Sequence, residues 1–358
     1  MYLRHSFCSQ TTSDNSMEIS QLGEFGLIDR LTEPFNTRVP STVLGVGDDT
    51  AILSQDSKRE TLVTTDLLLE GIHFDLMYCP LKHLGFKAVS VNVSDILAMN
   101  GRPEQIVVSI GVSKRFAVED IEALYLGIHE ACEVYGVDLV GGDTCSSLTG
   151  LTISITAIGS AEAGKAVRRS GAKVNDLICL SGNVGAAYMG LQLCEREKLA
   201  YDGTADFRPR FEGREYILQR QLRPYARLDV IEALRKAGIV PTSMIDVSDG
   251  VASELLHISK ASGVGCRIFD KKIPIDYETS AMAEELNINV ITAALNGGED
   301  YELLFTVPLG MKDLVEKIED VRLIGYITEE SDGCHLVAND GNLIPLLAQG
   351  HHFKKDEA

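Results

Sequence analysis

Several short stretches of this sequence place carboxylates beside Gly, Ser or Thr at the edge of an apolar run. They are the segments 45–49, 64–66, 92–95, 141–143 and 246–249. Carboxylate, hydroxyl and water oxygens are the ligands that Mg²⁺ takes in proteins, in preference to His or Cys. The small neighbouring residues let ligand oxygens come close, since Gly has no Cβ. The pattern therefore predicts a Mg²⁺-dependent enzyme that acts on phosphates; solvated turn aspartates are the alternative for any single stretch.

Two of these stretches carry adjacent or closely spaced acids. Asp48 and Asp49 repel each other unless a cation neutralises them. Asp246, Ser248 and Asp249 lie at the end of an expected strand and can converge on one point. We expect Ser248 or Asp249 to cap the next helix, which accounts for only one of these side chains. Both places therefore favour a metal site over a plain turn.

Other polar residues have both a functional and a structural explanation. His73 ends an expected strand and is either a ligand or structural, and Tyr125 lies on a helix stripe that by spacing belongs to the core. Arg168 and Arg169 either grip phosphate or are exposed linker charges. Segment 297–302 surrounds a Gly pair with acids, where a tight turn is the alternative. No Gly-x-x-x-x-Gly-Lys-Ser/Thr loop and no protein-kinase signature occurs, so metals and Gly-rich backbone would have to bind phosphate.

The composition is that of a globular protein with a strong negative charge. The chain has 358 residues, of which 45% are hydrophobic, and a formal net charge of −19. This length makes two domains the default expectation. The charge argues against a sequence-independent nucleic-acid binder, which needs a basic face. A small phosphorylated substrate remains compatible, since bound Mg²⁺ inverts the local field.

The cysteines and the first residues bear on location. The 8 cysteines contain no C-x-x-C pair, and several lie in apolar runs, which indicates buried thiols in a reducing, cytoplasmic compartment. No apolar run approaches the roughly 18–20 residues that span a bilayer, so we expect no membrane partner. Residues 1–16 are polar and lack the apolar core of a secretory signal. We expect residues 1–17 to be a disordered leader, whether translation starts at Met1 or at Met17.

Strand and helix patterns alternate along the whole chain. In the first half we expect strands over 61–74 (passing into a loop), 105–112 and 151–159, and helices over 84–100 and 118–135. In the second half we expect strands over 177–181, 244–247, 301–307 and 323–327. We expect one helix from the glycine turn 182–185 to about Glu197, a second over 227–237, and a third from Ser248 or Asp249 to about Ser262. The strand 151–159 reads as buried on both faces. The fold class is therefore α/β (α+β), with a domain boundary in the segment 160–176.

Taken in order, these motifs resemble those of the thiamine-monophosphate kinase family. The resemblance rests on the segments 22–25, 45–49, 64–66, 70–74, 92–95, 141–144, 169–172, 245–250 and 298–303. It implies the two-domain fold of aminoimidazole ribonucleotide synthetase. Residues 18–160 would bind metal and ATP and form a homodimer, and 161–358 would complete the active site. It also implies transfer of the γ-phosphoryl group of ATP to thiamine monophosphate, without nucleic-acid or membrane partners.

The resemblance further implies a set of site residues. The Mg²⁺ ligands would be Asp49, Thr64, Thr65, Asp66, Asp95, Asp143, Asp246 and Asp249. The ATP contacts would be Tyr125, Gly142, Asp143, Arg169 (or its neighbour Arg168) and Ser248. The contacts to thiamine monophosphate would be His73, Glu299 or Asp300, and Phe353. No covalent nucleophile stands out, which favours direct in-line transfer with several Mg²⁺ ions. Another ATP-using enzyme of the superfamily and a Mg²⁺-dependent phosphohydrolase are the alternatives.

Overall fold

The computed structural model describes most of the chain but not its two ends. The described residues are Gly26, Ile28, Thr32, 40–54, 58–201, 203–204 and 208–348. Residues Thr37–Ala348 form one compact unit, which contains both β-sheets. The expected leader 1–17 and Phe353 lie outside the described residues. The division into domains 18–160 and 161–358 stays a prediction.

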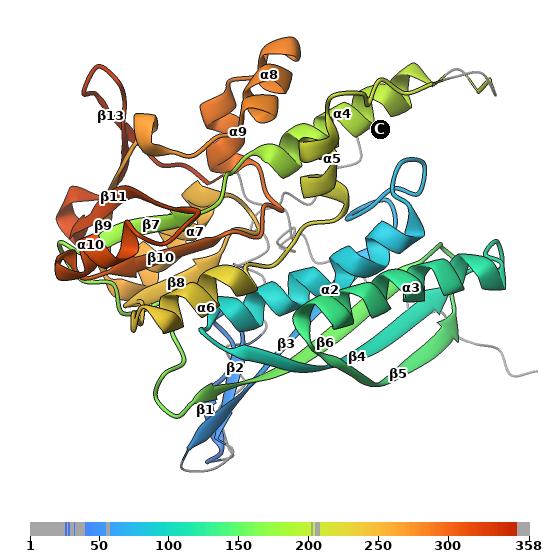
Figure 1. Cartoon of the computed structure of the whole chain (residues 1–358), viewed down its shortest axis with the longest axis horizontal. Helices are drawn as coiled ribbons and strands as arrows, with labels where there is room; N and C mark the ends of the chain where they lie inside the picture. The colour runs from blue at the N-terminus through green and yellow to red at the C-terminus, as the bar shows by residue number, and fades with distance from the viewer. Residues whose placement is uncertain are drawn as a thin grey trace, which may run out of the picture. The chain divides into compact units, whose positions relative to one another are not determined.

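The first sheet of this unit is covered on one face by two helices (Figure 1). Its strand order is β1-β2-β3-β6-β4-β5, and β4 and β5 run parallel. The strands are β1 (Thr42–Leu44), β2 (Ala51–Ser54), β3 (Arg59–Leu69), β4 (Arg102–Val112), β5 (Asp138–Ser146) and β6 (Thr152–Glu162). The covering helices are α2 (Leu81–Ala98) and α3 (Val118–Tyr135).

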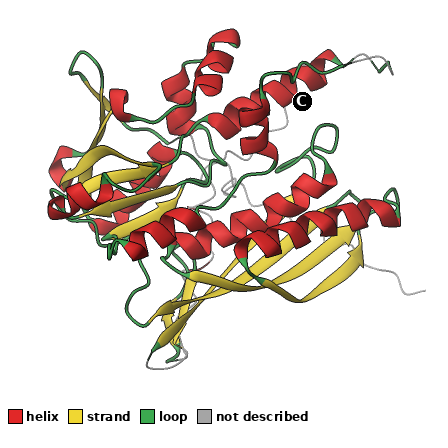
Figure 2. Cartoon of the chain, viewed as in Figure 1, coloured by secondary structure: helices red, strands yellow, loops and turns green. Residues whose placement is uncertain are grey.

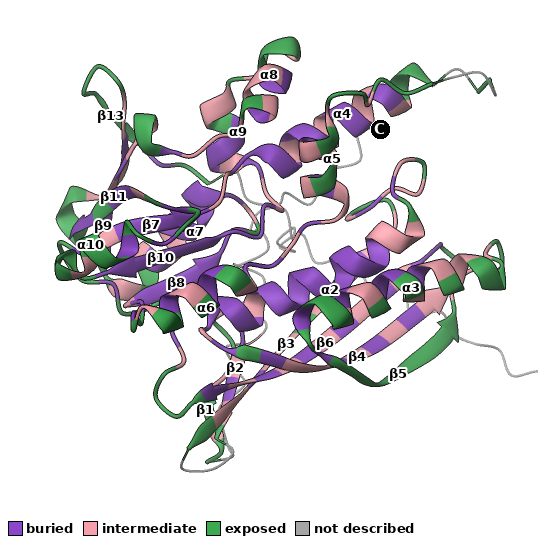
Figure 3. Cartoon of the chain, in the orientation of Figure 1, coloured by how far each residue is buried: buried purple, intermediate pink, exposed green. Residues whose placement is uncertain are grey.

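Helix α2 is buried along most of its length (Figure 3). Its close packing on α3 depends on two glycines. A Cβ on Gly85 would lie 2.0 Å from the carbonyl oxygen of Leu124, and a Cβ on Gly127 would lie 1.8 Å from that of Lys82. Such contacts exclude any larger residue. The tight α2–α3 layer therefore fixes the backbone of α2, and with it the point from which Asp95 projects.

The other face of the first sheet is much less covered. Residues along β6 alternate between buried and half-buried, so the expected burial of this strand on both faces is wrong. The reason is that α2 and α3 lie on the same side. Edge strand β5 is exposed over its whole length (Figure 3).

The second sheet has the strand order β13-β12-β9-β11-β7-β10-β8 (Figure 2). Its strands are β7 (Leu177–Ser181), β8 (Ser243–Asp246), β9 (Val264–Phe269), β10 (Leu303–Val307), β11 (Val321–Glu329), β12 (Cys334–Val337) and β13 (Leu343–Pro345). The helices of this half are α4 (Ala186–Ala200), α5 (Glu215–Leu222), α6 (Leu228–Lys236), α7 (Val251–Ser262), α8 (Tyr277–Glu285), α9 (Val290–Asn296) and α10 (Lys312–Val315). Edge strand β8 ends at Asp246, next to α2.

The expected α/β (α+β) class is confirmed, with one local error at a helix start. Neither Ser248 nor Asp249 caps α7; its N-cap is Gly250, without a side-chain hydrogen bond. Instead, the backbone N–H of Asp249 donates to Oε1 of Glu254 at 2.9 Å. Within the described residues, no helix combines the length and apolarity needed to cross a membrane.

Candidate active site

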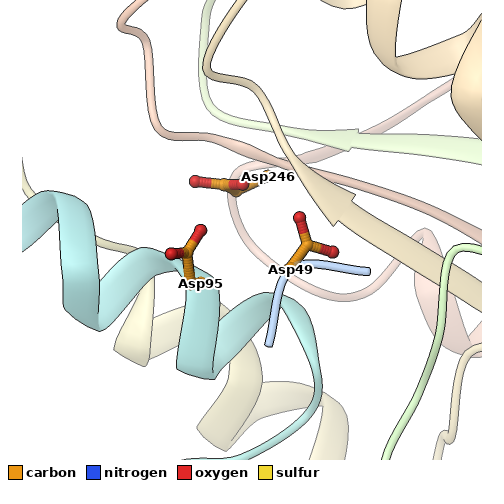
Figure 4. A group of neighbouring side chains, drawn as sticks. All are labelled: Asp49, Asp95 and Asp246. Atoms are coloured by element: carbon orange, nitrogen blue, oxygen red, sulfur yellow. The ribbon is translucent and has the colours of Figure 1, made fainter. Parts of the chain in front are cut away.

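Three aspartates that are far apart in the sequence meet at one point. Asp49 lies between β1 and β2, Asp95 on α2, and Asp246 at the end of β8. One carboxylate oxygen of each lies within 4.8 Å of the others. Figure 4 shows the three carboxylates directed toward a common space. We call these three residues the acid cluster.

Each carboxylate of the acid cluster is held by a neighbouring donor. The Thr64 hydroxyl donates to Oδ2 of Asp95 at 2.6 Å, and the Ser94 hydroxyl donates to Oδ2 of Asp246 at 2.5 Å. Nη2 of Arg169 donates to Oδ1 of Asp49 at 2.7 Å. The other oxygen of Asp49, Oδ2, is buried and has no hydrogen-bond partner among the described residues. A buried carboxylate oxygen without a donor is costly, so this position calls for a cation.

The pKa values of the acids in this region are raised, which also favours a bound cation. Burial, followed by the charge of Asp49, raises the pKa of Asp246 to about 7. Burial and the charges of Asp246, Asp66 and Asp49 raise the pKa of Asp95 well above its ordinary value. Burial raises the pKa of Asp66 to about 6. Burial and mutual repulsion therefore make it costly to ionise all of these carboxylates unless a cation neutralises them.

The acid cluster therefore fits a hard divalent cation. Among the residues that the structure describes, its ligand atoms are all oxygens, one buried oxygen lacks a partner, and no His or Cys belongs to the group. These are the ligand preferences of Mg²⁺. Asp66 is close enough for its charge to raise the pKa of both Asp95 and Asp246.

Strand β3 separates two of the predicted threonine ligands. Side chains alternate across a strand, so Thr64 and Asp66 share the face covered by α2, whereas Thr65 lies on the opposite face. There the Thr65 hydroxyl donates to the carbonyl of Ile155 at 3.1 Å and accepts from Thr156. The structure thus brings the Thr64 hydroxyl to the acid cluster but not that of Thr65.

The predicted residues on β5 and α3 lie apart from the acid cluster within one chain. Gly142 and Asp143 are exposed on β5, which is separated from β3 by β6 and β4. Three strand spacings correspond to about 14 Å. Tyr125 is half-buried on α3 and packs against the core. The glycine at 142 also has a structural reason, because a Cβ there would lie 2.0 Å from the Val108 carbonyl oxygen.

The loop after β8 and the loop before β10 are joined by backbone hydrogen bonds. The N–H of Glu299 donates to the carbonyl of Ser248 at 2.7 Å, and the N–H of Tyr301 donates to that of Val247 at 2.9 Å. Ser248 is exposed and Asp249 half-buried. Two motifs that lie some fifty positions apart in the sequence, 246–249 and 298–302, therefore form one wall beside Asp246.

Glu299 and Asp300 have different surroundings. Asp300 is fully buried, and its two oxygens accept the backbone N–H groups of Gly185 and Ala187 at 2.6 and 3.2 Å, at the start of α4. Both oxygens of this carboxylate are therefore engaged in hydrogen bonds within the protein. The side chain of Glu299 is 28% exposed. The geometry favours Glu299 over Asp300 as a ligand contact.

The other predicted ligand contacts are His73 and one of the two arginines, Arg168 or Arg169. Nδ1 of His73 accepts the backbone N–H of Leu69 at 3.0 Å, which fixes the ring at the end of β3. Of the two arginines, Arg169 reaches the acid cluster, while the carbonyl of Arg168 accepts from the N–H of Met244 at 3.0 Å.

Two residues of this region were missed in the sequence. Glu254 is a buried acid on α7 that holds the backbone of Asp249; burial raises its pKa well above the ordinary value. Lys87 is a buried cation on α2. The signal for Lys87 was a lysine inside an otherwise apolar helix, whereas no spacing rule indicates Glu254.

Comparison with known proteins agrees with this fold and identifies the family of the chain. Residues 47–161 match the family "AIR synthase related protein, N-terminal domain". The chain thus contains an AIR synthase-related N-terminal domain, which supplies Asp49 and Asp95 of the acid cluster. The thiamine-monophosphate kinase of Aquifex aeolicus is 37% identical over 88% of this chain and 95% of its own length. That of Bacillus subtilis is 33% identical over 93% of this chain and 100% of its own length.

A solved structure also matches this chain over most of its length. "AaThiL complexed with AMPPCP and TMP" superposes with a TM-score of 0.79 at 34% identity, covering 92% of this chain and 97% of that one. The chain belongs to the thiamine-monophosphate kinase family and is a kinase.

Proposed function

We propose that this protein transfers the γ-phosphoryl group of ATP to thiamine monophosphate, giving thiamine diphosphate and ADP. The observation that carries the proposal is the acid cluster with its buried Asp49 oxygen, which has no hydrogen-bond partner in the described part of the chain. A related solved structure contains an ATP analogue and TMP. The relatives named thiamine-monophosphate kinase are matched over nearly their whole length.

We infer that Mg²⁺ is held by Asp49, Asp95 and Asp246, with Thr64 and Asp66 adjacent. When bound, Mg²⁺ would neutralise the charge on the phosphates and bridge their oxygens. Thr65, Asp143 and Asp249 remain predicted ligands from the family resemblance. The net charge of −19 makes metal ions necessary for holding two phosphorylated substrates in one acidic site.

The chain's own residues support direct in-line transfer. Two hydroxyls that contact the acid cluster, those of Thr64 and Ser94, donate hydrogen bonds to its carboxylates. These hydroxyls orient ligands and are poorly placed to attack phosphorus. Arg169, which is ion-paired with Asp49, brings a fixed positive charge to the same place. The acceptor phosphate would therefore be the nucleophile, and no phosphoryl-enzyme would form.

One assay tests this function. The enzyme is incubated with ATP and thiamine monophosphate, with and without Mg²⁺, and thiamine diphosphate is measured by chromatography. We expect product only with Mg²⁺ present. Absence of thiamine diphosphate, under conditions where ATP demonstrably binds, would refute the proposal. ADP formed equally fast without thiamine monophosphate would indicate a phosphohydrolase instead.

We also propose that the protein is a cytoplasmic homodimer paired through its first sheet. Edge strand β5 is exposed throughout, including Leu139 and Val140 at 46% and 58% exposure. An exposed apolar edge strand is a template for pairing with another chain. It also carries Gly142 and Asp143, so pairing there would cover two predicted ATP contacts. Light scattering should give about twice the chain mass of 39.0 kDa; a monomer at micromolar concentration would contradict the proposal.

A further inference from the structure

Lys87 is a buried cation with a narrowly defined environment. Its side chain is 3% exposed, and its Nζ donates to Oε2 of Glu299 at 3.0 Å and to the carbonyl of Gln221 at 3.1 Å. These contacts tie α2 to α5 and to the loop before β10. A buried lysine is costly unless it is paired and hydrogen-bonded, so the partner carboxylate is needed to retain it.

The same oxygen of Glu299 takes a second donor. Nε2 of Gln221 donates to Oε2 of Glu299, also at 3.0 Å. Among the described residues, none donates to the other oxygen, Oε1. Oε2 of Glu299 therefore accepts two hydrogen bonds, whereas Oε1, on a partly exposed side chain, is available to accept one from a ligand.

The backbone of Glu299 is held as firmly as its side chain. Its φ is +65°, a conformation that non-glycine residues rarely adopt and that other contacts must maintain. The hydrogen bond from its N–H to Ser248 supplies one such contact and joins it to the loop that follows Asp246. The carboxylate thus has a set direction, and its backbone is fixed to the loop that follows Asp246.

We propose that Lys87, assisted by Gln221, is a positioning residue that directs Oε1 of Glu299 to accept a hydrogen bond from an amino group of the acceptor substrate. This inference rests on the proposed function, in which the acceptor carries an aminopyrimidine. An acceptor-only carboxylate discriminates between an amino group and a carbonyl at the same ring position, because a carbonyl cannot donate. Lys87 would in this way set substrate specificity without touching the substrate.

The test compares two acceptors in matched variants. Lys87→Met removes the buried charge, and Lys82→Met is the control. Lys82 lies on the same helix and is ion-paired with Glu130 on the exposed side, at 44% exposure. Steady-state kinetics are measured with thiamine monophosphate and with oxythiamine monophosphate, in which a carbonyl replaces the amino group.

We expect Lys87→Met to raise the KM for thiamine monophosphate at least about 10-fold, the effect of a hydrogen bond to a charged group. The preference for thiamine monophosphate over the oxo analogue should fall by a similar factor, while the KM for ATP stays within about 2-fold. Lys82→Met should keep wild-type preference, and Lys87→Arg should restore part of it.

A purely structural role predicts a different pattern. In that case Lys87→Met would affect both acceptors and ATP alike, and wild-type preference would persist, which would overturn the inference. If Lys87→Met does not fold, Gln221→Met removes the second donor and should shift the preference in the same direction; an unchanged preference there would equally overturn it. A wild-type enzyme that does not phosphorylate thiamine monophosphate would instead refute the proposed function.

Discussion

Asp95→Asn isolates what the acid cluster does, because it removes a charge and keeps the shape of the side chain. Burial and the charges of neighbouring carboxylates raise the pKa of Asp95 well above its ordinary value, which disfavours its charged form in the metal-free protein. An amide of the same shape avoids that unfavourable charge, so metal-free stability should change little. With Mg²⁺ present, ionised Asp95 supplies a negative charge, which the variant cannot do. The difference should therefore appear in the response to metal.

The size of the effect follows from the spacing of the carboxylates. A cation between the three oxygens lies no farther than 4.8 Å from the oxygen of Asp95, and at an effective dielectric constant of about 20 even one unit positive charge at that distance attracts a carboxylate by about 3.5 kcal/mol. Losing one such charge is enough to weaken Mg²⁺ binding about 100-fold. At a Mg²⁺ concentration 100 times the wild-type Kd, binding stabilises the wild type by about 2.7 kcal/mol and the variant by about 0.4 kcal/mol.

These energies convert to a measurable shift in melting temperature. A chain of 358 residues has an unfolding entropy of roughly 0.75 kcal/mol/K. Mg²⁺ should thus raise the Tm of the wild type by about 4 °C and that of Asp95→Asn by less than about 1 °C. Differential scanning fluorimetry with EDTA or Mg²⁺ measures both.

The control is Asp313→Asn, which removes an exposed carboxylate far along the chain and should keep the full Mg²⁺ response. Calorimetry in buffers of different ionisation enthalpy should also detect proton release when Mg²⁺ binds at pH 6.5. An equal Mg²⁺ response in Asp95→Asn and wild type, or binding without proton release, would refute the assignment of the cation to the acid cluster.

Three further outcomes follow from the structure. Because the pKa of Asp66 and Asp246 is raised to about 6 and about 7, the metal-free folded state binds extra protons, and their contribution to stability is lost as pH rises from about 4 to 7. The Tm gain from Mg²⁺ should therefore be larger at pH 8 than at pH 5.5, and the reverse order would contradict this. Glu302→Gln should cost roughly 3–5 kcal/mol in urea unfolding, since Glu302 is buried between two arginines at 2.6 and 2.7 Å; a loss below about 1 kcal/mol would show that the pairs are dispensable. Gly142→Ala should cost roughly 1–3 kcal/mol, because its Cβ would strike the neighbouring strand, whereas Gly141→Ala, with open space around it, should be nearly neutral by thermal melting.

Local pattern was sufficient to predict most elements of the chain. The amphipathic helix 118–135 and the strand 177–181 have the predicted bounds, because periodicity and flanking turn residues act over a few positions. The chemistry of the candidate metal site could also be predicted from the sequence, since carboxylates beside small residues favour hard cations wherever they lie. The proposed reaction came from the family resemblance.

Tertiary structure decided which of those oxygens meet. Asp49, Asp95 and Asp246 converge because α2 lies between the first sheet and β8, an arrangement that no local spacing encodes. The pleat of β3 turned Thr65 away from Thr64, and strand order placed Asp143 at a distant edge. The carboxylate of Asp300 accepts a backbone N–H at the start of α4, whereas that of Glu299 accepts from Lys87 on α2. Long-range packing makes these choices, and it depends on how whole elements fit together rather than on neighbouring residues.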